Sequence, residues 1–234
     1  MRFIQNKNKQ EVEENPFAFS IGDLMSALLF IFVLILSSLM LQVKQQQAED
    51  REITEDYRKV KQQLYIDLNA EFKDDLKSWD AIIDSTELSL RFQEPRSLFD
   101  VGKKDLQPRF QEILSDFFPR YIKLLSRKKY RNSIEEIRIE GHTDTDGQYM
   151  YNMRLSQERT TTVLEYCLNQ IDNSNFKWVS SHITANGFSY SRPLLKSDGT
   201  EDKQHSRRVE FRIKTNAESK LEEIAKKRGL LDVR

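Results

Sequence analysis

One carboxylate lies inside the most apolar part of the chain. Asp23 is followed by an uncharged run from Leu24 to Leu41, and apolar residues precede it back to Pro16. An aspartate at the centre of a membrane helix costs roughly 2.5 to 3.5 kcal/mol, and such residues usually face a bundle interior or an ion path. Because apolar surroundings disfavour the ionised carboxylate, Asp23 could load a proton on one side and release it when its surroundings change.

Ser26 lies one helical turn after Asp23 and could hydrogen-bond the protonated carboxyl group. We therefore interpret Asp23 as a candidate ion carrier, which implies a partner subunit, and Ser26 as support for the ion path. In the alternative interpretation Asp23 lies just outside the membrane and caps the helix, helped by Ser20 and Gly22.

The rest of the chain shows no catalytic or metal-binding pattern. The histidines His142, His182 and His205 share no metal-ligand spacing with Cys167 or with an acidic pair. The segment GFSYS lacks the second glycine of a nucleophile elbow, and neither a P-loop nor a dinucleotide fingerprint occurs. We expect a protein that is not an enzyme, with no metal and no cofactor.

Composition and length limit the architecture. The 37 basic and 37 acidic residues cancel, so the overall charge gives no sign of a nucleic-acid partner. The 234 residues allow one domain of the usual size, about 100 to 150 residues, with attachments. We expect an α/β protein with one transmembrane helix, an amphipathic connecting helix and one α/β sandwich domain.

The apolar run predicts a membrane-spanning helix. From Leu24 to Leu41 such a helix would be about 27 Å long at about 1.5 Å per residue, close to the hydrocarbon thickness of a bilayer. The run is longer than the apolar region of a signal peptide, and no small-residue cleavage site follows it. We assign residues 17–43 to the transmembrane helix and residues 1–16 to a cytoplasmic tail, although the basic flank is offset by glutamates.

Residues 44–84 predict an amphipathic linker helix, because apolar residues recur at spacings of three or four with charges between them. Three roles fit this pattern: a dimerising stalk, a plug that regulates ion flow, or a helix packed against its own domain. The apolar positions are Ile53, Tyr57, Val60, Leu64, Leu68, Phe72, Leu76, Trp79 and Ile83.

Residues 85–216 predict the α/β domain, because strand-like and helix-like segments alternate. We expect strands over 87–92, 134–140 and 183–188 and from Arg207 onward, with helices over about 109–125 and 152–169. Residues 217–234 form an expected charged C-terminal helix. The single cysteine, Cys167, falls within the second expected helix, where we expect it to be buried; an intermolecular or redox thiol is the alternative.

The membrane segment PFAFSIGDLMSALLFIFVLIL resembles the membrane helix of the MotB class, in which an aspartate follows an aromatic and a small residue. Asp23 matches the ion-carrying aspartate of that class. The resemblance implies a dimer of this chain surrounded by a pentamer of A subunits, with ion flow, by analogy of H+, driving rotation.

The C-terminal part resembles the peptidoglycan-binding OmpA family through GHTDTDG, YNMRLSQER, ITANGFSYSRPL and DGTEDKQHSRRVEFRI, in that order. The resemblance implies that Asp144 and Arg159 hold the two ends of a diaminopimelate side chain. A carboxylate would pair with the ammonium group, and a guanidinium would bind the terminal carboxylate. The alternative is an internal salt bridge between Asp144 and Arg159.

Three further residues follow from the same motifs. Asn152 would support the loop or the ligand, and Arg207 and Arg208 match the family's arginine pair. Consecutive strand residues face opposite sides, so at most one of these arginines should reach the ligand. The preceding residue is Ser206 where the family usually has asparagine, which puts one ligand or loop contact in doubt.

Two kinds of motor share this architecture, the flagellar stator and the Zorya antiphage defence complex. The stretch DLMSALLFIFVLIL and the compact linker look more similar to the Zorya type. This resemblance implies an inner-membrane protein with a periplasmic, peptidoglycan-binding domain, which reaches cytoplasmic effectors only indirectly. A passive wall anchor without ion transport is the alternative of a different class.

Overall fold

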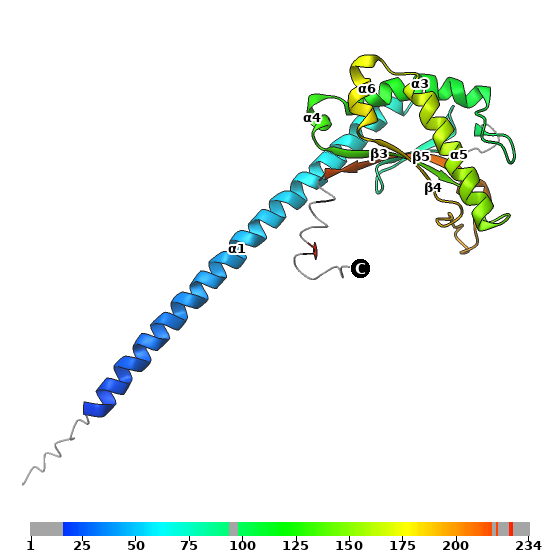
Figure 1. The fold of residues 1–234 in the computed structure, drawn as a ribbon. Helices are drawn as coiled ribbons and strands as arrows, with labels where there is room; N and C mark the ends of the chain where they lie inside the picture. Colours follow the sequence, from blue (N-terminus) through cyan, green and yellow to red (C-terminus); the bar gives the residue numbers. More distant parts are fainter. Residues whose placement is uncertain (1–15, 94–97, 217–218, 220–224, 227–234) are drawn as a thin grey trace, which may run out of the picture. The chain divides into compact units, whose positions relative to one another are not determined.

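The computed structural model describes residues 16–93, 98–216, 219 and 225–226, which are coloured in Figure 1. The chain divides into two compact units, Met1–Arg51 and Glu52–Arg234. Helix α1 (Pro16–Phe72) contributes to both. The expected cytoplasmic tail, up to residue 15, and almost all of the expected C-terminal helix lie outside the described residues.

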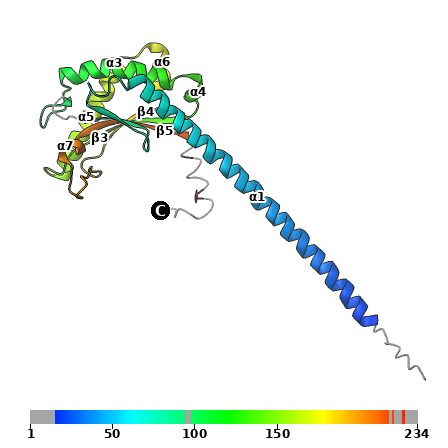
Figure 2. The same ribbon diagram turned by 180° about the vertical axis from the view of Figure 1, so that it is seen from behind.

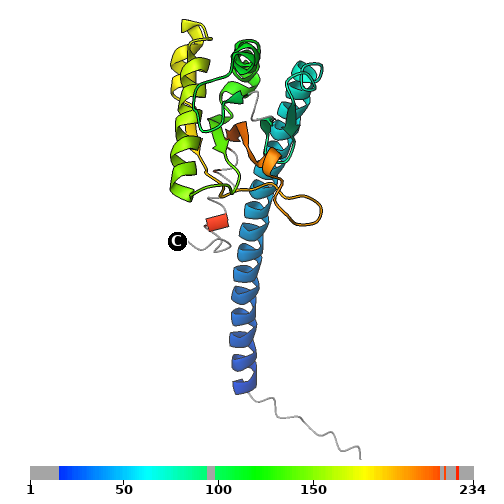
Figure 3. The same cartoon turned by 90° about the vertical axis from the view of Figure 1, so that its right-hand side faces the viewer.

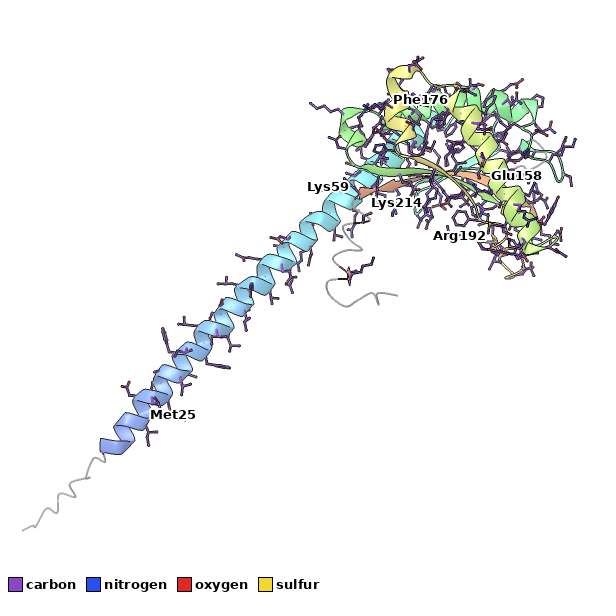
Figure 4. The ribbon with its side chains drawn as sticks, viewed as in Figure 1. Met25, Lys59, Glu158, Phe176, Arg192 and Lys214 are labelled. Carbon is purple, nitrogen blue, oxygen red and sulfur yellow. The ribbon has the colours of Figure 1, made fainter. Side chains whose placement is uncertain are left out.

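The part of α1 in the first unit is an exposed apolar helix. Its segment Ile21–Arg51 is long and apolar enough to cross a membrane. Leu24 is 65% exposed and Leu36 48%, and Figure 4 shows side chains projecting outward around Met25. Because a soluble protein rarely leaves so large an apolar surface in water, this helix needs lipid or a partner around it. This segment is the transmembrane helix that the sequence predicts.

The last turns of α1 belong to the core of the second unit. Leu64, Leu68 and Phe72 follow one another at intervals of four residues and are at most 1% exposed. Side chains four residues apart lie on one face of a helix. The Phe72 ring lies 5.3 Å from the ring of Phe117, centroid to centroid. Residues 64–72 are therefore packed against the domain that follows them.

The linker helix is shorter than the sequence predicts. We expected it to reach residue 84, but α1 ends at Phe72 and hydrogen-bonded turns follow. Asp80 has a positive φ of 49°, and Ile83 lies in strand β1 (Ala81–Asp84). The spacing misleads here because Trp79 folds back on the same core, with its ring 5.8 Å from that of Phe72.

Five strands form one mixed sheet in the order β1-β2-β5-β3-β4. Strands β3 and β4 run parallel, and the other neighbouring pairs run antiparallel. Four of the five strands confirm the sequence-based expectations. The fifth, β1, was not expected, because its residues were assigned to the linker helix. The bounds not yet given are β2 Ser89–Phe92, β3 Ile134–His142, β4 Ile183–Gly187 and β5 Arg208–Thr215.

Helices cover one face of this sheet (Figure 2). The main ones are α3 (Pro108–Leu125) and α5 (Tyr149–Leu168). Seen from the side, the green α3 lies between the yellow-green α5 and the cyan end of α1 (Figure 3). The shorter helices are α4 (Lys128–Arg131), α6 (Asn173–Ser180) and α7 (Lys203–Ser206). The α/β sandwich expected from the sequence is confirmed.

Aromatic side chains fill the space between the helices and the sheet. The ring of Phe117 in α3 lies 5.0 Å from Phe211 of β5 and 5.3 Å from Phe92 of β2. All three residues are fully buried. Aromatic pairs at such separations contribute about 0.5 to 1.5 kcal/mol beyond the burial of their surface. This core holds the sheet and α3 as one body.

Two glycines let α5 approach the sheet closely. A Cβ atom on Gly141 of β3 would lie 2.6 Å from Thr160 Cγ2, and one on Gly187 of β4 would lie 2.7 Å from Ser156 Oγ. Both gaps are too short for a real Cβ atom, so any larger residue would push the helix away. The first turns of α5 therefore stay beside the loop that follows β3.

Candidate functional site

A cavity of about 370 Å³ lies where the loop after β3 meets the first turns of α5. The segment just before β5 and a loop near residue 100 complete its wall. Carboxylates and guanidiniums both line it, so it offers charges of both signs. Its lining consists of Phe99, Asp100, Val101, Gly102, Thr143, Asp144, Asp146, Tyr151, Asn152, Leu155, Arg159 and Arg207.

Asp144 follows the end of β3 by two residues and is 6% exposed. Its Oδ1 accepts a hydrogen bond from the Asp146 backbone N–H at 3.2 Å. Its Oδ2 accepts a hydrogen bond from Arg207 Nη1. A buried carboxylate needs such partners, because an isolated charge away from water is costly.

Asn152 supports the loop that carries Asp144. Its Nδ2 donates to the Asp146 carbonyl at 2.7 Å and to the Asp144 carbonyl at 3.5 Å. The side chain is 4% exposed, so these bonds form largely out of water. Asn152 therefore contacts the loop in this structure, which is one of the two roles that its motif position implied.

The same loop is braced from its other side by the segment before β5. Glu201 accepts a hydrogen bond from the Thr145 backbone N–H at 3.1 Å and another from the Thr145 hydroxyl. Lys203 donates to the Asp146 carboxylate. These bonds join positions 56 and 57 residues apart in sequence, so the loop is fixed to a segment that is distant in the chain.

Arg159 reaches the cavity from α5, two turns after Asn152. Its Nε donates to the Lys103 carbonyl at 2.8 Å, and its Nη2 donates to the Asp100 carbonyl at 3.0 Å. The guanidinium carbon lies 4.7 Å from the centre of the Phe99 ring, a cation–π distance. Two hydrogen bonds and a ring therefore fix the plane of the guanidinium.

The charges of the cavity interact without forming the salt bridge considered from the sequence. Asp144 pairs with Arg207, whereas the contacts of Arg159 are to backbone carbonyls. Burial lowers the pKa of Arg159 below its usual value, and Arg207 adds to this effect while Tyr151 and Asp144 oppose it. A guanidinium remains charged in proteins, so the cavity holds two cations close to one buried carboxylate.

The two consecutive arginines lie in different surroundings. Arg207 lines the cavity. Arg208 is 6% exposed; its Nε donates to Glu210, and its Nη1 donates to the Ser206 carbonyl at 3.0 Å. Of the pair assigned as peptidoglycan-binding, only Arg207 is in position to touch a ligand in the cavity. The alternation of side chains along a strand is the physical reason.

Glu210 and Arg208 belong to a buried charged network on the helix-free face of the sheet. Glu210 also accepts a hydrogen bond from Arg91 Nε of β2 at 2.9 Å. Burial alone would raise the pKa of Glu210, but Arg208 and Arg91 outweigh it and lower that pKa to about 2. Arg208 therefore holds the start of β5, directly after Arg207, in place.

Ser206, at the position where the family usually has asparagine, also has a structural role. It is fully buried, and its hydroxyl oxygen accepts a hydrogen bond from the Leu194 N–H at 2.9 Å. The side chain thus holds the loop between β4 and β5 against the segment before Arg207. The contact is to the protein's own backbone.

Sequence reasoning missed several residues of the cavity. Phe99, Asp100 and Tyr151 were not assigned a role, although Tyr151 begins the recognised motif YNMRLSQER. The signal for Phe99 would have been an aromatic residue before a polar turn, which is too common to single out. Its role depends on a contact with Arg159, which lies 60 positions later in the sequence.

Asp23 and Ser26 lie on the exposed apolar helix of the first unit. The Ser26 hydroxyl donates to the Gly22 carbonyl of its own helix at 2.7 Å. Such a bond to the preceding turn is common for serine in membrane helices. The serine oxygen keeps lone pairs that can accept a hydrogen bond from a protonated carboxyl group.

Fold and site together define an OmpA-like domain behind an N-terminal transmembrane helix, and the model of the OmpA family matches residues 98–208. Over 233 residues the chain is 40% identical to the Zorya protein ZorB of Escherichia coli strain Crooks, covering 95% of this chain and 98% of that protein. The chain belongs to the ZorB family.

A second ZorB protein, from Escherichia coli O139:H28, is 28% identical over 221 residues and covers 90% of this chain and 85% of that protein. Among solved structures, a putative MotB-like protein from Desulfovibrio vulgaris aligns with 26% identity and a TM-score of 0.47, covering 70% of this chain and 94% of that chain. The family membership confirms the Zorya type over the flagellar type, as the membrane segment and linker indicated.

Proposed function

We propose that this protein is the peptidoglycan-anchored B subunit of a proton-driven rotary motor complex that senses phage infection in Zorya antiphage defence. The observation that carries the proposal is a combination within one chain. A carboxylate lies in an exposed apolar helix, and a cavity of opposite charges is built from the motif residues of a wall-binding domain.

The cavity suits a zwitterionic ligand such as the diaminopimelate side chain. The Asp144 carboxylate attracts an ammonium group, and the guanidiniums of Arg159 and Arg207 attract a carboxylate through charge-assisted hydrogen bonds. Arg159 is held by Phe99 and two carbonyls, so little conformational entropy is lost when a ligand binds. This supports attachment to peptidoglycan.

The membrane helix suits an ion path formed with partner subunits. Ile21–Arg51 leaves its apolar surface uncovered, and Asp23 lies on that surface. A carboxylate facing lipid is costly, so we infer that A subunits, a pentamer around a dimer of this chain, enclose Asp23. The N-terminus then lies in the cytoplasm and the wall-binding domain in the periplasm.

Each proton that crosses a potential of about 100 mV releases about 2.3 kcal/mol. Useful work therefore requires repeated loading and release of Asp23 while the A subunits move. We infer that this movement couples an envelope disturbance to cytoplasmic effectors, which need no direct contact with this chain.

The test is phage plating on cells that carry the complete gene cluster, with wild-type protein compared with Asp23→Asn. We expect the amide to abolish protection, because it cannot carry a proton, while protein level and assembly with the A subunit stay unchanged. Asp23→Glu, which keeps a titratable group, should retain part of the protection.

Glu49→Gln is the matched control, since it makes the same charge-to-amide change at an exposed position on the same helix. We expect it to protect as the wild type does. Full protection by a well-expressed Asp23→Asn protein would refute the ion-carrying role and leave a passive wall anchor as the function.

A further inference from the structure

Ser189 is a buried polar residue with a strained backbone, two positions after the end of β4. It is fully buried and has a positive φ of 51°. Glycine adopts this left-handed conformation readily, whereas a residue with a Cβ atom is strained in it. Glycine would therefore suit this position better, unless the serine hydroxyl makes a contact that glycine cannot make.

The hydrogen bonds of Ser189 to α5 supply such a contact. Its backbone N–H donates to Ser156 Oγ at 3.0 Å, and its Oγ donates to the Tyr149 carbonyl at 3.0 Å. Tyr149 begins α5, and Ser156 lies about two turns later on the same helix. The bond from the hydroxyl is the one that glycine would lose. Ser189 therefore ties the end of β4 to the first two turns of α5.

The carbonyl of Ser189 binds the loop that carries Asp144. It accepts a hydrogen bond from the Thr143 backbone N–H at 2.9 Å. Strands β3 and β4 run parallel with Gly141 opposite Gly187, so this bond continues their ladder beyond the last paired residues. Thr143 lines the cavity and directly precedes Asp144. The backbone position of Asp144 is thus linked to Ser189.

The bonds of Ser189 join the two elements that carry opposite charges into the cavity. Asp144 follows β3, and Arg159 lies on α5. The Arg159 guanidinium binds two backbone carbonyls, whereas the Asp144 carboxylate pairs with Arg207. The separation of Asp144 and Arg159 therefore depends on how α5 is held against the loop. Asn152 links the helix to the loop directly, and Ser189 links them through its hydrogen bonds to both.

We propose that Ser189 is a positioning residue for ligand binding, because its hydroxyl holds α5 against the loop and so sets the separation of the Asp144 carboxylate and the Arg159 guanidinium. This inference rests on the proposed wall-binding function. The side chain of diaminopimelate ends in an ammonium and a carboxylate on one carbon atom, at a fixed separation. Both charged contacts form together only when the charges of the cavity match that separation.

The experiment compares two tripeptide stems by calorimetry with the full-length protein in detergent. One stem ends in meso-diaminopimelate and the other in L-lysine, whose side chain ends in an ammonium alone. We expect the wild type to bind the diaminopimelate stem about tenfold more tightly, because the lysine side chain offers no carboxylate to Arg159. Ser189→Gly should lower the affinity for the diaminopimelate stem severalfold and leave that for the lysine stem nearly unchanged.

Thermal unfolding separates a positioning role from a general structural one. Ser189→Gly relieves the backbone strain, whereas Ser189→Ala removes the same hydroxyl and keeps the strain. We therefore expect Ser189→Ala to melt at a lower temperature than Ser189→Gly, although both variants should lose the preference for the diaminopimelate stem equally. If the preference followed the melting temperature, with Ser189→Gly binding both stems as the wild type does, the positioning role would be overturned.

Ser191→Gly is the matched control, because its exposed side chain also donates to a backbone carbonyl, that of Phe188 at 2.7 Å, in the same loop. It should keep the wild-type preference. A loss in this variant as large as in Ser189→Gly, or equal affinities of the wild type for the two stems, would also overturn the positioning role. If the wild type bound neither stem, the proposed wall binding itself would fail, and this role with it.

Discussion

At the scale of single residues, the cavity uses arginine for its geometry as well as its charge. Arg159 donates hydrogen bonds from Nε and Nη2 to two backbone carbonyls, and its guanidinium lies over the ring of Phe99. The plane of the guanidinium is therefore fixed before a ligand binds. A lysine ammonium has no such plane, and its three donors are not held in a fixed planar fork. The charge alone is therefore not sufficient for this position.

We expect Arg159→Lys to lower binding to purified peptidoglycan about tenfold, a loss of about 1.4 kcal/mol. Co-sedimentation of the full-length protein with sacculi measures this. Arg154→Lys makes the same change at an exposed position on the same helix and should bind as the wild type does. Equal binding by both variants would show that Arg159 does not contact the wall.

The buried carboxylate Glu210 provides a pH-dependent prediction. Its pKa is about 2 in the folded protein, against a usual value of 4.5. A carboxyl group whose pKa is lowered by folding stabilises the fold above its unfolded pKa and loses this contribution as the pH falls. The stabilisation by Glu210 is therefore complete above about pH 4.5 and disappears as the pH falls toward about 2.

Glu210→Gln leaves Arg208 and Arg91 buried without their carboxylate, so at pH 7 we expect a loss of roughly 3 kcal/mol in the free energy of unfolding. The difference in melting temperature from the wild type should narrow between about pH 4.5 and pH 2. Glu112→Gln, on the exposed surface of α3, should change little at any pH. A difference in melting temperature between Glu210→Gln and the wild type that stays constant with pH would contradict the role given to Glu210.

The motifs predicted which candidate wall-binding residues would gather at one site, but not how those residues pair. Asp144, Asn152, Arg159 and Arg207 all line one cavity, as their shared motif context implied. The partner of Asp144 is Arg207, on a segment more than 60 residues later, and sequence spacing contains no information on such a contact. The split between Arg207 and Arg208 was predictable from strand alternation, but which of them faces the cavity was not.

At the scale of elements, the end of α1 is part of the folded domain. Leu68 is 1% exposed, whereas Ile66 on the same helix is 48% exposed. We expect Leu68→Ala to lower the free energy of unfolding by about 2 to 5 kcal/mol, because a buried cavity would remain. Ile66→Ala should cost much less, since its side chain is already half in water.

Thermal unfolding of the two variants, followed by circular dichroism, measures the difference. If Leu68→Ala and Ile66→Ala have the same melting temperature, α1 is not packed on the domain in solution. The linker would then be a free stalk over its whole length, which is the dimerising-stalk role that the sequence also allowed.

Element boundaries were predictable where a local signal marks them and not elsewhere. Pro108, which favours the first turn of a helix, begins α3 close to the expected residue. The end of α1 carries no such signal. Leu76 and Trp79 continue the apolar spacing of the helix, although they lie in the hydrogen-bonded turns that follow it. Strand β1 has only four residues, too few for a clear alternation.

At the scale of the whole molecule, the proposed function gives one chain two roles that can be lost separately. A motor needs a titratable group to take up energy, and it needs a fixed anchor against which force can act. We propose that Asp23 serves the first need in the membrane helix and that the Asp144 cavity serves the second in the C-terminal domain. Neither role can replace the other, so we expect defence to require both.

We therefore expect Asp23→Asn to retain binding to sacculi and to lose phage protection, and Asp144→Asn to lose both. Each variant should still co-purify with the A subunit, because neither change removes the apolar surface of the helix from Ile21 to Arg51. Sedimentation, co-purification and plating on the same strains measure the three properties. We expect the loss of protection because a motor that slips in the wall cannot transmit its torque. If Asp144→Asn protected fully although it no longer bound sacculi, anchoring would not be needed for the motor to act.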